Sequence, residues 1–260
     1  MFGVPRERPG DWNFRLIGFP VRVSLFFWLM AVMLGPHEPR GALIWVACVF
    51  VSILIHEFGH GLMARWLGFR SRILLYELGG LCVSDSESQS SNQRIAILAA
   101  GPGAQFLLLG VVMLCGSAFL EISPAENMTL AKRFLGVATN DIITSDASTE
   151  ARELYIYMFW INFFWPLLNL MPIWPLDGGQ IACELFSKIN RRDGRRWGHI
   201  ISMVTAGIMA LYTLANDTDD STFKFLRVLF FAGFAFANFQ ILQSYHRHHQ
   251  LYGSDRDPDW

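Results

Sequence analysis

Two histidines and a glutamate in the run His56-Glu57-Phe58-Gly59-His60 are the residues of this chain whose types and spacing best suit catalysis. On a helix, residues four apart lie on one face, one turn from each other, so both imidazoles can bind a single zinc ion. In hydrolytic zinc sites of this kind the intervening carboxylate can serve as general base. The motif therefore predicts that His56 and His60 bind zinc and that Glu57 activates a water molecule.

The motif by itself leaves two other interpretations open. The three side chains could be ordinary buried polar groups that pair with one another or with a second helix. The motif also occurs in other classes of zinc protease, but the metzincin pattern needs Gly at position 63 and His at position 66, where this chain has Met63 and Trp66. The Glu-zincin pattern needs a later ligand glutamate with Asp or Asn four residues on, and Glu184, for instance, is followed at that distance by Lys188.

The composition indicates a membrane protein. Of the 260 residues 52% are hydrophobic and 17% are charged, whereas soluble domains carry about 25% charged residues. The net charge of -1 gives no case for nucleic-acid binding. The four scattered cysteines predict no disulfide framework; they are Cys48, Cys82, Cys115 and Cys183. The basic and then apolar N-terminus is interpreted as a first membrane segment that is not removed as a signal peptide.

Six apolar segments are long enough, or nearly so, to cross a bilayer core of about 30 Å. They cover residues 21–35, 42–66, 95–120, 154–170, 200–214 and 225–242. We therefore expect an all-α polytopic membrane protein of about six transmembrane helices. Residues 1–243 would form a single transmembrane domain, with a core at 21–180 and additional helices at 200–242, followed by a short tail at 244–260.

Lysine and arginine in the connections predict the orientation. They concentrate in the N-terminal tail, in the second-to-third connection and in the fourth-to-fifth connection, which contains the cluster 191–196. Both termini and these connections are therefore expected in the cytoplasm. The second segment then runs inward, and His56, about nine residues before Arg65, would lie roughly 14 Å from the cytoplasmic surface. A metal held there would be inside the membrane, where ionisable groups are costly and usually functional.

The connection between the second and third segments is expected to contain a small β-structure. Residues 70–83 are rich in β-formers and contain Gly79-Gly80, which predicts a membrane-associated hairpin or sheet. The following residues 84–93 are serine-rich and are interpreted as a link. In one interpretation Gly79-Gly80 only makes the turn of a surface hairpin. In the other, the strand presents an edge that receives an extended substrate.

A catalytic zinc needs a third protein ligand and an open position for water. The candidate is Asp177, in the run from Asn169 to Gly179 at the inner end of the fourth segment. Pro172 and Pro175 should break the helix there, and irregular backbone at membrane depth is tolerated only where protein or a cavity surrounds it. Taken alone, the run could equally be an ordinary helix end with Asp-Gly-Gly as its turn.

The two motifs together resemble the site-2 protease family of intramembrane zinc metalloproteases. The family combines H-E-x-x-H in an early membrane helix with Asn-x-x-Pro-x-x-x-Leu-Asp-Gly in a later one, as this chain does from Asn169. Gly79-Gly80 is similar to the family's membrane-associated strand loop. Ala100-Gly101-Pro102 is similar to the Ala-Gly-Pro that opens its third core helix. Matching segments cover most of residues 21–180.

The resemblance implies a site and a reaction. His56, His60 and Asp177 would bind one zinc per chain, and Glu57 would activate the water. Asn169 would contact the substrate backbone or the developing oxyanion. The activity would be hydrolysis of peptide bonds within or near transmembrane segments, either for signalling or for clearing signal-peptide remnants.

The resemblance also implies partners and a location. The substrate would be a transmembrane protein already trimmed by another protease, in a bacterial or archaeal cell membrane, and a regulatory membrane partner would fit the family. The chain is expected to be a minimal form without the PDZ or CBS domain that some members carry. Two residues depart from the family pattern: Trp174 stands where a second Pro is frequent, and Gln105 where many members have Asn.

Two alternatives to this activity stay open. The first is a non-catalytic, zinc-binding membrane interaction protein on the same scaffold, which Glu57 disfavours because such a protein needs no base. The second is a membrane zinc protease that acts on prenylated protein tails, which the Asp177 motif disfavours. The tract His246, His248 and His249 is interpreted as part of a solvated tail at the membrane face.

Overall fold

The computed structural model describes residues 8, 10–76, 79–84, 89–134, 149–215 and 221–252. Contacts between Cα atoms divide the chain into two compact units. The first, called the sheet unit, comprises residues 2–88 and 100–168. The second, called the C-terminal unit, comprises residues 89–99 and 169–260 together with Met1. The boundary falls inside one helix, α3, and each unit is described by itself.

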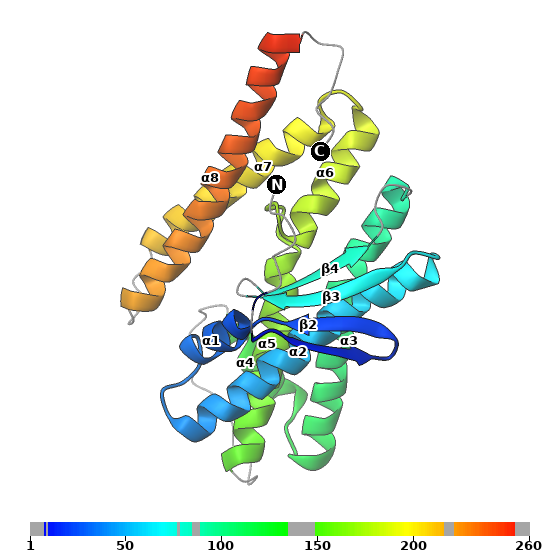
Figure 1. The fold of residues 1–260 in the computed structure, drawn as a ribbon. Helices are drawn as coiled ribbons and strands as arrows, with labels where there is room; N and C mark the ends of the chain where they lie inside the picture. The colour runs from blue at the N-terminus through cyan, green and yellow to red at the C-terminus, as the bar shows by residue number, and fades with distance from the viewer. Residues whose placement is uncertain are drawn as a thin grey trace. The chain divides into compact units, whose positions relative to one another are not determined.

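The sheet unit is built on four strands. They are β1 (Trp12–Leu16), β2 (Phe19–Val23), β3 (Ser71–Tyr76) and β4 (Gly79–Ser84), and they lie in that order across the sheet (Figure 1). The pairs β1–β2 and β3–β4 are antiparallel, and β2–β3 is parallel. The predicted β-structure between the second and third segments is thus one half of a larger sheet, whose other half comes from the N-terminus.

Alternate residues of β2 and β3 point to one face of the sheet and form its core. Val21 and Val23 pair with Ile73 and Leu75, and all four are buried. They pack with Phe58 and other apolar residues of helix α2 (Pro39–Trp66), which covers this face (Figure 1). The sheet therefore holds one side of the helix that carries the H-E-x-x-H motif.

The prediction of one continuous helix over residues 21–35 is wrong. Its first residues belong to β2, and Ser24 then caps the nine-residue helix α1 (Leu25–Met33). A helix of that length spans about 14 Å, roughly half of the bilayer core. The error has a physical reason: Phe19, Val21 and Val23 alternate with Pro20 and Arg22, which is the period of a strand with one buried face.

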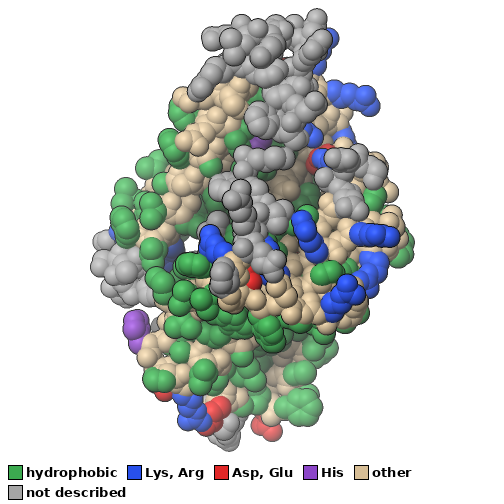
Figure 2. Space-filling view, viewed as in Figure 1, with side chains coloured by type: hydrophobic (Ala, Val, Ile, Leu, Met, Phe, Trp, Pro, Cys, Tyr) green, Lys and Arg blue, Asp and Glu red, His purple; other side chains and the backbone are tan. Residues whose placement is uncertain are grey.

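Within the described residues, four helices are long and apolar enough to cross a membrane. They are α2, α3 (Ser91–Phe119), α7 (Gly194–Ala215) and residues Lys224–Tyr245 of α8 (Ser221–Tyr252). The segment 154–170 is helical as part of α5 (Thr149–Asn169), but its crossing of the membrane stays a prediction. Figure 2 shows apolar side chains over much of the face in view, as lipid-facing surface requires.

The remaining helices complete the two units. Helix α4 (Pro124–Phe134) contacts α5 in the sheet unit through buried Tyr155, whose hydroxyl donates to the Asn127 side chain. In the C-terminal unit, α6 (Asp177–Ile189) packs on α7, and α7 packs along α8 (Figure 1). Arg94, in the first turn of α3, pairs with Glu184 of α6 at 3.0 Å.

Some predictions fall partly or wholly outside the described residues. They concern parts of the link at 84–93, parts of the connection at 121–152, and the side chains of the histidine tract at 246–249. The single domain predicted over residues 1–243 stays a prediction.

Candidate metal centre

Helix α2 is tied to its surroundings at both ends. The carboxylate of Glu38 caps its first turn by accepting hydrogen bonds from the backbone N–H groups of Gly41 and Arg40, which lower the pKa of Glu38. At the other end, the Arg65 guanidinium donates to the Ile17 carbonyl, 2.9 Å away, in the turn between β1 and β2. The first contact stabilises the beginning of α2, and the second ties its end to the β1–β2 turn.

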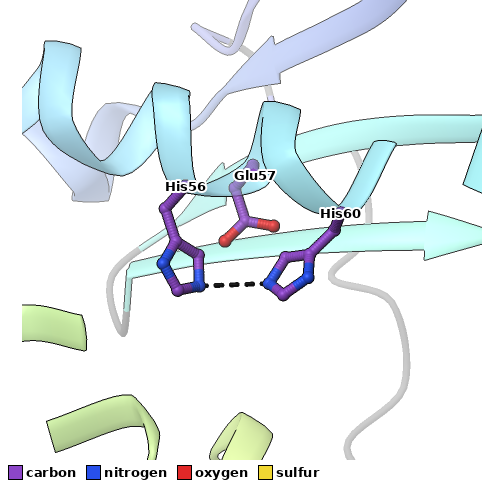
Figure 3. A group of neighbouring side chains, drawn as sticks. All are labelled: His56, Glu57 and His60. Carbon is purple, nitrogen blue, oxygen red and sulfur yellow. Dashed lines mark hydrogen bonds between the residues drawn. The ribbon is translucent and has the colours of Figure 1, made fainter. Parts of the chain in front are cut away.

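The side chains of His56, Glu57 and His60 form a buried cluster on α2 (Figure 3). These residues are 3%, 3% and 5% exposed. The two imidazole rings turn toward each other, and their Nε2 atoms lie 3.1 Å apart. One potential ligand atom from each of the three residues lies within 4.8 Å of the others, so the cluster could hold a metal ion. The structure therefore brings together all three residues that the motif singled out.

The geometry of the two histidines fits zinc. Two ligands on a tetrahedral zinc with bonds of about 2.0–2.1 Å lie about 3.3 Å apart, close to the separation of the Nε2 atoms. Gly101 of α3 faces these atoms: a Cβ at this position would lie 2.2 Å from His60 Nε2 and 2.9 Å from His56 Nε2. The glycine thus leaves open the space toward which both ring nitrogens point. Imidazole nitrogen with carboxylate oxygen is a donor set that zinc accepts.

Gln105 of α3 sets the orientation of the first histidine. Its Oε1 lies 2.8 Å from His56 Nδ1, and both residues are buried. A carboxamide oxygen only accepts, so Nδ1 carries the hydrogen and Nε2 keeps its lone pair for a metal. Such partners of a ligand histidine fix its tautomer and its ring orientation. Gln105 departs from the family pattern, and in the structure its amide oxygen has a defined contact with His56.

Strand β4 passes directly beside the glutamate. A Cβ on Gly80 would lie 2.2 Å from Glu57 Oε1, so the backbone of β4 is against the carboxylate. Gly79 has a φ of +121°, and a Cβ there would lie 2.8 Å from the Trp165 ring of α5. Both glycines therefore have a steric reason beyond a turn: one accommodates Glu57 and the other accommodates Trp165.

Asn169 and Asp177 belong to the C-terminal unit. Asn169 ends α5, residues 170–176 are not helical, and Asp177 is the first residue of α6. The predicted break at Pro172 and Pro175 is confirmed. Asp177 is buried, and its place at a helix N-terminus favours the negative charge that a carboxylate ligand carries. The two histidines belong to the sheet unit.

Three buried polar residues escaped the sequence analysis. Ser202 and His199 of α7 and Asn238 of α8 form a hydrogen-bonded group around the backbone of Trp174, in the loop before Asp177. The available signal was that each is a polar residue inside a long apolar segment. That signal marks a residue as important without naming its partner.

Comparisons with known proteins agree with these motifs. A family model described as peptidase family M50 matches residues 44–213. The chain is 27% identical over 180 residues to a zinc metalloprotease of Methanocaldococcus jannaschii, covering 67% of this chain and 45% of the relative. It is 26% identical over 172 residues to stage IV sporulation protein FB of Bacillus subtilis, covering 65% and 48%. The chain thus spans about half the length of these curated relatives.

A solved structure shares the fold. The site-2 protease from Methanocaldococcus jannaschii matches with a TM-score of 0.51 at 20% identity, over 89% of this chain and 95% of that one. At this identity the likeness concerns the fold alone. The family model covers well over half of the chain and includes the H-E-x-x-H motif and the Asp177 motif. The chain therefore belongs to peptidase family M50, the site-2 protease family.

Proposed function

We propose that this protein is a zinc-dependent intramembrane endopeptidase that cleaves peptide bonds within or near transmembrane segments of other membrane proteins. The observation that carries the proposal is the pair of buried imidazoles whose Nε2 atoms lie 3.1 Å apart beside Glu57, on a helix apolar enough to cross a membrane. Membership of family M50 and curated relatives named as zinc metalloproteases support it.

His56, His60 and Asp177 are proposed to hold one zinc ion per chain. Three protein ligands leave the fourth position open, as catalytic zinc sites require. A zinc ion held there would act as a Lewis acid: it would lower the pKa of a bound water molecule toward neutral pH and would polarise a carbonyl group. Asp177 completes the set in this proposal because the motif that contains it matches the family's ligand motif, and because it is a buried carboxylate at a helix N-terminus.

The chain's own residues would carry the proton steps. Glu57 takes a proton from the attacking water and later delivers it to the leaving amine. Its burial and its contact with the β4 backbone hold the carboxylate beside the histidines. Asn169 is proposed to donate a hydrogen bond from its amide to the substrate backbone or to the developing oxyanion.

The β4 edge is proposed to hold the substrate. A peptide bond in a transmembrane helix is shielded by the helix's own hydrogen bonds, so the helix must unwind before attack. An unwound segment has N–H and C=O groups to satisfy, and an edge strand can satisfy them without demanding a particular sequence. Strand β4 ends the order of the described strands, and its first residues, Gly79 and Gly80, lie against Trp165 and Glu57.

The proposed setting follows from these assignments. Substrates are membrane-spanning segments with helix-weakening residues, presented after another protease has removed an outer domain. The protein is multi-pass in a cell membrane, with both termini and the connections containing 84–93 and 191–196 in the cytoplasm. For the N-terminus this requires that the segment between β2 and α2, which contains α1, brings the chain to the outer side before α2 begins. The positive-inside rule supports this orientation. A regulatory membrane partner is part of the same proposal.

The decisive variant is Glu57→Gln. It removes the base and keeps the size of the side chain, so proteolysis of a model transmembrane substrate should fall by roughly 10² to 10⁴. Zinc content and thermal unfolding in detergent should stay near wild type, because Glu57 is not a ligand in this proposal. Cleavage at the wild-type rate by Glu57→Gln would rule the mechanism out.

The same preparation tests the alternative of a non-catalytic zinc protein. Near-equimolar zinc in the wild-type protein, without cleavage of any transmembrane segment offered in native membranes, would favour that alternative. Captured partners of Glu57→Gln, identified by mass spectrometry, would show whether the partners are substrates with a bond that the wild type cuts.

A further inference from the structure

The loop that leads into Asp177 is held by side chains of two helices that lie far from it in sequence. The backbone N–H of Trp174 donates to Ser202 Oγ of α7 at 3.0 Å. The Trp174 carbonyl accepts from Asn238 Nδ2 of α8 at 2.8 Å. Both backbone polar groups of one residue in a non-helical segment are therefore satisfied by side chains, where a helix would have used its own backbone.

The Asn238 amide uses its bonding capacity in a defined way. Its two N–H groups serve two carbonyls, those of Trp174 and Phe234, each at 2.8 Å from Nδ2. Its oxygen then accepts from His199 Nδ1, 2.9 Å away, which places the imidazole hydrogen on Nδ1. The His199 ring also meets the Trp174 ring nearly edge-on, with centroids 5.5 Å apart. Asn238 and His199 together therefore hold both the backbone and the ring of Trp174.

The Ser202 hydroxyl also both donates and accepts a hydrogen bond. It donates to the Gly198 carbonyl at 2.8 Å and accepts from the Trp174 N–H. Ser202 and Asn238 are completely buried. Buried polar groups in apolar helices are costly unless they are hydrogen-bonded. If α7 and α8 only packed against each other, apolar residues would serve at these positions. Their presence indicates that α7 and α8 have a task at the Trp174 backbone.

The first turn of α6 transmits the position of Trp174 to Asp177. A Cβ on Gly179 would lie 2.1 Å from the Trp174 nitrogen, and a Cβ on Gly178 would lie 2.1 Å from the Leu170 carbonyl oxygen. The turn that begins with Asp177 therefore rests directly on the backbone of the loop. Because these contacts involve backbone atoms, which cannot swing aside as side chains do, a shift of the loop moves Asp177 with it.

We propose that Ser202 and Asn238, with His199 behind Asn238, are positioning residues for the Asp177 carboxylate. In this assignment the α7–α8 pair fixes the loop in the conformation in which Asp177 binds zinc. The inference rests on the proposed function, in which Asp177 is the third ligand. It gives the two C-terminal helices, which contribute none of the proposed ligands, a part in the metal centre.

The test compares two hydroxyl residues of the same helix. Ser202 and Thr213 of α7 are both buried, and each hydroxyl donates at 2.8 Å to the carbonyl four residues earlier. Ser202 differs because it also accepts from Trp174. Zinc release from the purified full chain to a chromophoric chelator should be roughly 10- to 100-fold faster in Ser202→Ala and in Asn238→Leu, the usual effect of removing support from a metal ligand. Thr213→Val and Ser202→Thr, which keeps the hydroxyl, should release zinc at the wild-type rate.

A double-mutant cycle separates positioning from general destabilisation. If Ser202 acts through Asp177, then Ser202→Ala should add nothing to the zinc release of Asp177→Ala. A full additional effect in the Asp177→Ala background would overturn the inference, as would wild-type release by both Ser202→Ala and Asn238→Leu. If Asp177→Ala itself releases zinc at the wild-type rate, then the proposed third ligand is wrong, which is a different result from failure of the positioning role alone.

Discussion

His56 and His60 project from the interior of a continuous 28-residue helix, whereas Asp177 begins a helix that follows the non-helical residues 170–176. The spacing of the histidines is set by the helix itself, so the neighbouring elements need only leave room. Glycines do this: Gly59 admits the Ala100 carbonyl, which a Cβ would approach to 2.3 Å, and Gly101 leaves space in front of the ring nitrogens.

The loop before Asp177 has no such internal scaffold. Its backbone groups take their partners from Ser202 and Asn238, which are 28 and 64 residues from Trp174. In the proposed metal centre, the half formed by His56 and His60 (the histidine half) is thus sensitive to added bulk, and the half formed by Asp177 (the Asp177 half) is sensitive to lost hydrogen bonds. Both halves can be found in the sequence as local motifs, but the hydrogen bonds that hold the loop before Asp177 depend on the fold.

The largest effect that would sharpen this comparison is expected from an added methyl group. Gly101→Ala places a Cβ 2.2 Å from His60 Nε2, so the ring must move and zinc should be lost. Gly103, two residues along the same helix, has no atom within 4 Å of the Cβ position. Gly103→Ala should therefore keep full zinc content and change the free energy of unfolding by at most about 1 kcal/mol.

Metal analysis and thermal unfolding in detergent would measure both glycine variants. Stoichiometric zinc in Gly101→Ala would show that the ring nitrogens do not need the space in front of them. The interpretation that zinc binding by the histidine half depends on steric room would then be wrong.

A smaller effect is expected at Gln105, whose amide oxygen accepts a hydrogen bond from the His56 ring. Gln105→Ala frees the His56 ring to rotate, so zinc release to a chelator should accelerate by roughly 10- to 100-fold. Gln105→Glu keeps an acceptor for His56 Nδ1 and should largely restore retention. Asn127→Ala is the matched control, because Asn127 is a buried amide of the same unit whose side chain accepts from Tyr155.

If Gln105→Ala and Asn127→Ala release zinc alike, then Gln105 is only a packing residue. In that case zinc binding by the histidine half would need no hydrogen-bonded support. Its contrast with the Asp177 half, whose loop is held by hydrogen bonds, would become sharper.

The sequence predicted the elements whose signals are local. The apolar run at 42–66 corresponds to α2, Pro39–Trp66, and the i, i+4 histidines form the cluster on it. The two prolines predicted the end of α5, which stops at Asn169. Helix ends were off by a few residues, as at α7, predicted from 200 and beginning at Gly194.

The unpredicted parts depend on contacts between distant residues. The alternation from Phe19 to Val23 was readable, but the parallel pairing of Val21 with Ile73 closes a long loop that no local pattern specifies. Ser202 and Asn238 are polar residues in apolar segments, but nothing local in the sequence identifies their partner, which is the backbone of Trp174 in another part of the chain. Such contacts are set by packing of the whole unit.

The smallest expected effect concerns β4, beside the histidine half, and tests whether the strand touches substrate. In an antiparallel edge strand, backbone N–H groups point alternately toward the neighbouring strand and toward the open side. The N–H of Cys82 therefore points opposite to those of Leu81 and Val83, and the residue of β3 that pairs with each of these positions is known.

Proline at a position whose N–H points toward β3 removes a ladder hydrogen bond and should lower the unfolding temperature. Proline at a position facing outward should spare the fold and zinc content but remove one hydrogen bond to an extended substrate. That bond is worth about 1 kcal/mol, or about a five-fold loss in kcat/KM. Cleavage that stays at the wild-type level in the outward-facing variant, or falls only when the protein unfolds, would leave β4 as support for Glu57 alone.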